Sequence, residues 1–127
     1  MKGIVVGTDN RLTVQDFEAP LYRTVGKAVD GWIEIVRPGG LKKPYVMVVN
    51  EEGLIKGLPA NLTGCLLYGT PTHGSPIVGN IVIMKEGWTD EGMDLLGLTD
   101  EEITVITQEL VALFERAGKV KKGAKRK

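Results

Sequence analysis

Residues 45–49, YVMVV, decide the fold class, because they form an apolar run almost without interruption. A short run of this kind is typical of a strand that is covered on both faces. A second such run, IVIM at 81–84, follows further along the chain. With 17 glycines and only 6% aromatic residues, the chain favours many turns and short elements over a bundle of long helices.

The flanking segments add further elements. Two β-rich runs around Asp9-Asn10 predict a hairpin, and Pro20 opens a short helical pattern near 20–29. The alternating stretch WIEIVR at 32–37 predicts another strand. Near the C-terminus, Thr99 and Glu102 have the spacing of a capping box. The apolar spacing that follows predicts an amphipathic helix ending near Gly118.

These elements do not alternate regularly between strand and helix, so we expect an α+β fold. Its sheet is predicted to be small, mixed or antiparallel, with about five to six strands, beside a short helix near 20–29 and a C-terminal helix near 100–117. NEEG at 50–53 is interpreted as a hairpin turn leading into a returning strand at 54–58. The pattern leaves 61–69 open between helix and strand, and predicts loops at 69–76 and 86–94.

A chain of 127 residues is expected to form one domain. We assign it to 1–117 and predict a disordered tail at 118–127, which carries six basic residues and no acids. Residues 1–117 hold 10 basic and 16 acidic residues, a balance that disfavours nucleic acid except through the tail. A single cysteine and the lack of a long apolar stretch predict a cytoplasmic protein without a membrane span.

The sequence lacks the residue patterns that most catalytic and cofactor-binding sites require. With one His and one Cys, the sequence offers no metal-ligand cluster, and no glycine-rich phosphate loop is present. His73 is interpreted as an exposed loop residue and Cys65 as a small interior side chain. The adjacent Glu51 and Glu52 are interpreted as solvated turn residues. We therefore expect no cofactor, no metal and no enzymatic activity.

Binding requires less than catalysis: an apolar or aromatic wall with a few polar groups suffices. Core packing is the alternative role for the aromatic residues, and an ordinary turn is the alternative role for the glycines and asparagines. If the chain has a site, Lys56 to Asn61 is expected to form one wall of it. The candidate ligand-binding residues are Trp32, Lys56, Gly57, Asn61, Thr63, Tyr68 and Asn80.

Four segments together resemble a family of small domains of unknown function carried by phages, prophages and plasmids. They are GWIEIVRP (31–38), YVMVVNEEGLIKGLPAN (45–61), LLYGT (66–70) and IVGNIVIMK (77–85). The resemblance covers about residues 1–100, and the sequence departs from it at Asn80, where the family more often has an acid. It implies a mobile-element context, in which small non-catalytic domains act on the host by binding.

Two functions follow as hypotheses. In the first, the protein sequesters a small phosphorylated or nucleotide signal and so counteracts host defence. The protein is then expected to be a homo-oligomer, in which a second subunit closes the site. In the second, it is a protein–protein interaction module that inhibits a host protein, its acidic body mimicking nucleic acid while the terminal helix or a strand edge makes contact.

Overall fold

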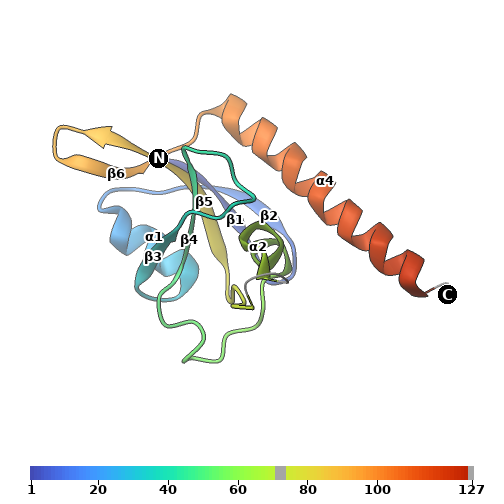
Figure 1. Cartoon of the computed structure of the whole chain (residues 1–127). Coiled ribbons are helices and arrows are strands. Elements are labelled where there is room, and N and C mark those ends of the chain that lie inside the picture. The colour runs from blue at the N-terminus through green and yellow to red at the C-terminus, as the bar shows by residue number, and fades with distance from the viewer. Residues whose placement is uncertain (71–73, 126–127) are drawn as a thin grey trace.

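The computed structural model describes residues 1–70 and 74–125, and the side chains of the last helix as far as Arg116. Its elements confirm the predicted α+β class (Figure 1). In chain order they are β1 (Lys2–Val6), β2 (Leu12–Asp16), α1 (Leu21–Val29), β3 (Ile33–Val36), β4 (Tyr45–Asn50), α2 (Leu62–Tyr68), β5 (Ile81–Thr89), β6 (Gly92–Leu96) and α4 (Asp100–Lys125).

The strands form one six-stranded sheet in the order β2-β1-β5-β4-β3, and every pairing in it is antiparallel. β5 is longer than its neighbours, and its two ends pair with different strands. Its first part, Ile81–Ile83, pairs with β1, whereas Lys85–Thr89 pairs with β6. β5 therefore holds both the body of the sheet and the last hairpin.

Helices cover both faces of this sheet. Ile81 and Ile83 of β5 belong to a core cluster that includes Leu67 of α2 and Ile106 and Leu110 of α4. The alternate residues, Val82 and Met84, pack in a second cluster with Val25 and Val29 of α1. In Figure 1, α1 accordingly lies on the opposite side of the sheet from α2. The expectation that YVMVV is covered on both faces is confirmed, since Val46 and Val48 face α1 while Met47 and Val49 face α2 and α4.

The predicted hairpin at NEEG is wrong. Residues 51–57 form a series of turns rather than a turn and a strand, with Lys56 N donating to Glu52 O at 2.9 Å and Leu58 N to Gly53 O at 3.0 Å. The physical reason is that β4 already has β3 on one edge and β5 on the other. A strand returning directly from β4 would have no edge to pair with.

Two other segments are now assigned. The open segment at 61–69 is helix α2, which Asn61 caps at its start and Gly69 ends with a φ of 84°. The predicted loop at 86–94 is wrong, because most of it belongs to the β5–β6 hairpin. That hairpin extends away from the body (Figure 1), and Trp88 within it is 80% exposed. Because the two strands of this hairpin bury few side chains, their sequence is polar and contains glycine, and this composition resembles that of a loop.

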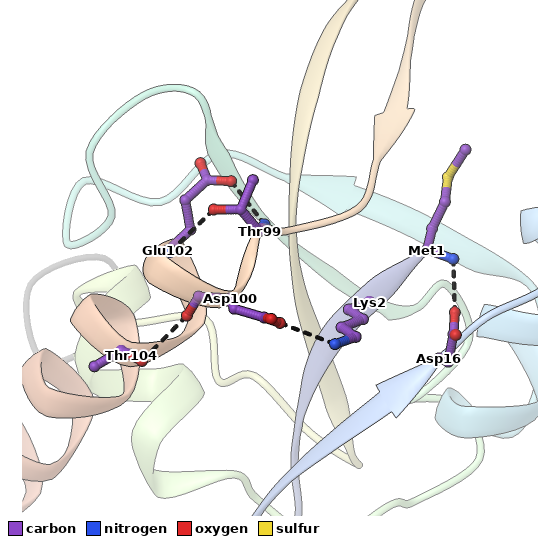
Figure 2. Close-up of polar contacts among 7 residues, drawn as sticks. All are labelled: Met1, Lys2, Asp16, Thr99, Asp100, Glu102 and Thr104. Carbon is purple, nitrogen blue, oxygen red and sulfur yellow. Dashed lines mark hydrogen bonds and ion pairs between the residues drawn. The ribbon is translucent and has the colours of Figure 1, made fainter.

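Polar contacts attach the start of α4 to the sheet. The predicted capping box is present, with Thr99 N donating to Glu102 Oε1 at 2.9 Å and Glu102 N to Thr99 Oγ1 at 3.2 Å. Lys2 of β1 donates to Asp100 at 2.8 Å, and the N-terminal amine pairs with Asp16 of β2 at 2.7 Å (Figure 2). The bond from Lys2 to Asp100 thus ties the first turn of α4 to β1, while the amine–Asp16 pair ties β1 to β2.

Glu102 also binds the strands beneath it. Its carboxylate accepts from Lys85 Nζ of β5 and from the Tyr45 hydroxyl of β4, both at 2.8 Å. Burial alone would raise the pKa of Glu102, but the bonds from Lys85, Thr99 and Tyr45 outweigh it and lower the pKa to about 2. Glu102 therefore joins α4 to two central strands as an anion.

α4 continues to Lys125, past its predicted end near 117. Ile106 and Leu110 are buried and Leu113 packs against the same core, whereas Phe114 is 40% exposed, so the contact of the apolar face with the body weakens after Leu113 in the described part of the helix. The division into a domain at 1–117 and a tail at 118–127 stays a prediction, since the side chains from 117 on lie outside the described residues.

We expect Glu102→Gln to lower the free energy of unfolding by about 1–3 kcal/mol, because it weakens charge-assisted bonds from two strands. Urea denaturation at pH 7 measures this. Glu101→Gln is the matched control, because Glu101 is exposed and accepts no side-chain bond in the described part of the chain. Equal losses in the two variants would contradict the role given to Glu102.

The same carboxylate predicts an acid dependence. Because the folded pKa of about 2 lies below the ordinary pKa of 4.5 for a glutamate, Glu102 contributes its full stability above about pH 4.5 and loses it as the pH falls toward 2. The stability difference between the wild type and Glu102→Gln should therefore shrink over this range. A difference that stays constant from pH 6 to the acid limit of folding would contradict the lowered pKa.

Candidate functional site

Asn61, expected to be part of a ligand-binding wall, is fully buried and serves the fold. Its Nδ2 donates to Val6 O at 3.0 Å and to Gly79 O at 2.9 Å, while its Oδ1 accepts from Gly64 N at 2.9 Å. The amide thus links β1, the start of β5 and the first turn of α2. A direct contact with ligand is incompatible with this placement.

The remaining predicted residues do not form one site. Thr63 is buried in the first turn of α2, and Asn80 accepts a bond from Thr8 N at 3.3 Å beside the β1–β2 turn. Gly57 is exposed, with a φ of 68° in the turns after β4. Tyr68 lines a cavity on the α2 side of the sheet. Trp32 and Lys56 alone lie beside the same surface.

That surface is a shallow hollow of about 750 Å³ between α1 and the start of β3, which we call the aromatic hollow. Two large rings on it are mostly in solvent: Trp32 is 66% exposed and Tyr22 is 56% exposed. Its lining residues are Tyr22, Arg23, Gly26, Lys27, Asp30, Gly31 and Trp32.

The amphipathic pattern of α1 builds this hollow. Val25 and Val29 face the core, which turns Tyr22, Arg23 and Lys27 outward. The helix then ends at Asp30 in the left-handed conformation, with a φ of 65°. The sequence pattern alone presents these three residues as an ordinary solvated helix face, which is why they were not predicted as site residues.

Lys56 reaches the hollow from the segment after β4. Its Nζ donates to Asp30 O at 3.1 Å, where a cation also suits the C-terminal end of a helix. Nearby, Asn50 Nδ2 donates to Val29 O at 2.8 Å. A Cβ at Gly31 would lie 2.8 Å from Lys56 Nζ and 2.9 Å from Asn50 Nδ2, so a larger residue there would displace both side chains, the flexible lysine more easily than the buried asparagine. The first role of Lys56 is therefore structural, and its charge adds to the hollow.

The hollow is a basic patch on an acidic body. Arg23, Lys27 and Lys56 surround it, and Asp30 is the one carboxylate among its lining residues. Neither Arg23 nor Lys27 forms an ion pair within the described residues. Such unpaired cations attract anions toward the two exposed rings.

A second opening, of about 540 Å³, lies on the α2 side of the sheet, and we call it the acidic cavity. Glu34 and Glu51 line it, and no Lys or Arg is found among the described residues of its walls. The predicted solvated turn is confirmed for Glu51, which is exposed in the turns after β4. Its place on the wall of a cavity was not predicted, because the course of 51–58 depends on which strands flank β4. The predicted Tyr68 forms part of the same wall.

Other candidate chemistry finds no support. Cys65 exchanges hydrogen bonds with the backbone of Ile77, at 3.4 Å from Sγ to O and 3.3 Å from N to Sγ, which fits an interior side chain. His73 lies outside the described residues. In the part of the chain that is described, no three His, Cys, Asp or Glu side chains gather to hold a metal ion. No helix there has the length and apolar character needed to cross a membrane.

Fold and surface together define a small α+β domain with an aromatic, basic hollow on one side and an acidic cavity on the other. The chain belongs to the family described as a domain of unknown function, DUF3846, whose model matches residues 1–111. The match reaches further than the resemblance to about residue 100 and includes the part of α4 that packs on the core. No curated protein and no solved structure matches the chain. The phage or plasmid context stays a prediction.

We expect Asn61→Ala to lower the free energy of unfolding by at least about 2 kcal/mol, because it leaves several buried backbone groups without partners. Asn80→Ala is the control; it removes a single bond of 3.3 Å and should cost less than about 1 kcal/mol. Thermal or urea unfolding measures both. A stable Asn61→Ala variant would show that the amide is not the structural link described above.

Proposed function

We propose that the protein binds a small phosphorylated ligand with an aromatic base, such as a nucleotide, in the aromatic hollow, and sequesters it without converting it. One observation carries this proposal: two largely exposed aromatic rings lie beside three cations on an otherwise acidic body. Rings of this size are seldom left in solvent together unless they serve an interface or a ligand.

The two kinds of side chain suit the two parts of such a ligand. Stacking of a base on an aromatic side chain contributes about 1–3 kcal/mol and tolerates different bases. A guanidinium presents several donors in a plane and can bind phosphate oxygens in pairs, while lysines add point charges. Trp32 and Tyr22 would hold the base, and Arg23 and Lys27 would hold the phosphate, with Lys56 adding to the positive field.

The lining favours binding over conversion. Among the described residues that line it there is no Ser, Thr, Cys or His, and Asp30 is the one carboxylate. The hollow is also shallow, so tight retention requires a second wall. A second copy of the chain would supply it, in line with the expected homo-oligomer. Sequestration of a host signal would then fit the mobile-element context that the resemblance implies.

A protein partner is the second candidate for the same surface. Trp, Tyr and Arg dominate the binding energy of protein interfaces, and all three line this hollow. The shallow shape suits a protruding side chain of a partner as well as a base. The two candidates differ in whether a free nucleotide binds.

Tryptophan fluorescence tests the proposal. Trp88→Phe leaves Trp32 as the one tryptophan of the chain, so the emission reports on the hollow. We expect adenosine monophosphate to change this emission saturably, and adenosine to bind more weakly because it lacks the phosphate. Arg23→Ala with Lys27→Ala should weaken binding of the monophosphate about tenfold or more.

Lys42→Ala with Lys43→Ala is the matched control, since it removes two exposed lysines that do not line the hollow. It should leave the affinity within about twofold of the parent. No saturable signal with nucleoside mono-, di- or cyclic phosphates at millimolar concentration would contradict the small-ligand function. It would leave the protein partner as the candidate for this surface.

A further inference from the structure

The acidic cavity has walls that are fixed before any ligand arrives. A bridge joins Ala60 to Val78, Asn61 N donates to Ile77 O at 2.8 Å, and Gly79 N donates to Pro59 O at 2.7 Å. A Cβ at Gly53 would lie 2.7 Å from Val78 Cγ2, so the backbone after β4 is pressed against the facing wall. A ligand would not have to order this cavity, which lowers the free-energy cost of binding.

The floor of the cavity is apolar. Val49 and Ile77 are buried and belong to the core cluster under α2, and Val36 packs against the same cluster. Leu54 and Ile55 stand at the cavity with their side chains largely in solvent. Together with the ring of Tyr68, these groups offer contact to a hydrocarbon body rather than to a hydrated ion.

The charged groups of the cavity are both negative. Glu34 and Glu51 form no ion pair within the described residues. Among the described residues that line the cavity none is basic, so a phosphate would meet repulsion from the two carboxylates. A cation would instead meet two carboxylates beside an apolar floor.

From this combination we propose that the acidic cavity is a second binding site, which takes a small organic cation: an ammonium group on an apolar body. The volume of about 540 Å³ lies within the range of small-molecule pockets. A calcium or magnesium ion fits less well, since such ions require a shell of oxygen ligands and the floor here is hydrocarbon. The lining residues of the acidic cavity differ from those of the aromatic hollow, so this proposal does not depend on the function proposed for the hollow.

Amide NMR spectra of the labelled protein test this assignment with hexylammonium, the isosteric neutral hexanol and the anion hexanoate. We expect hexylammonium to shift the amides of 34–36, 49–55, 75, 77 and 78 and to bind about tenfold more tightly than hexanol. Hexanoate should shift none of them. Raising the salt should weaken hexylammonium binding, because both carboxylates are open to screening.

Glu34→Gln with Glu51→Gln should abolish the preference for hexylammonium over hexanol. The matched control, Glu52→Gln with Glu91→Gln, removes the same charge from exposed residues outside the cavity and should keep the preference. Equal binding of hexylammonium and hexanol by the wild type, or shifts confined to other residues, would overturn the proposal. So would tighter binding of calcium, or of a blocked tripeptide with a central lysine, because the site would then belong to a metal ion or to a protein segment.

Discussion

The structure depends on the burial of one strand on both faces. Ile81, Val82, Ile83 and Met84 of β5 are each almost completely removed from water, two on each side of the sheet. Burying an aliphatic side chain of this size contributes about 1.5–3 kcal/mol, and both helical layers pack on the groups concerned. Since β1, β4 and β6 all pair with β5, this strand sets the register of its three partners directly, and of β2 and β3 through β1 and β4.

Once β5 and β4 are side by side, the segment between β4 and α2 has to cross the end of the sheet. Two asparagines hold it there: Asn50 bonds the end of α1, and Asn61 bonds β1 and the start of β5. The same segment separates the two candidate sites. Lys56 faces the basic hollow, whereas Glu51 and Leu54 face the acidic cavity. The positive Lys56 and the negative Glu51 thus lie on opposite sides of this segment, which the buried side-chain amides of Asn50 and Asn61 hold in place.

The sequence predicted those features that depend on near neighbours. Apolar runs identified β4 and the buried part of β5, and the spacing of Thr99 and Glu102 identified the start of α4. It did not predict the β5–β6 hairpin, whose strands bury little and so lack an apolar pattern. The role of Asn61 was also out of reach, because its partners Val6 and Gly79 lie 55 and 18 residues away in the chain. For the same reason Tyr22, Arg23 and Lys27 became site candidates only when the chain brought Trp32 and Lys56 beside them.

The central functional claim is that the hollow beside α1 receives a phosphorylated aromatic ligand. A crystal structure grown with a saturating nucleoside monophosphate tests it most directly. The account predicts a base stacked on Trp32 or Tyr22, with the phosphate within hydrogen-bond distance of Arg23 or Lys27. A nucleotide bound in the acidic cavity, or a hollow left empty at saturation, would contradict it.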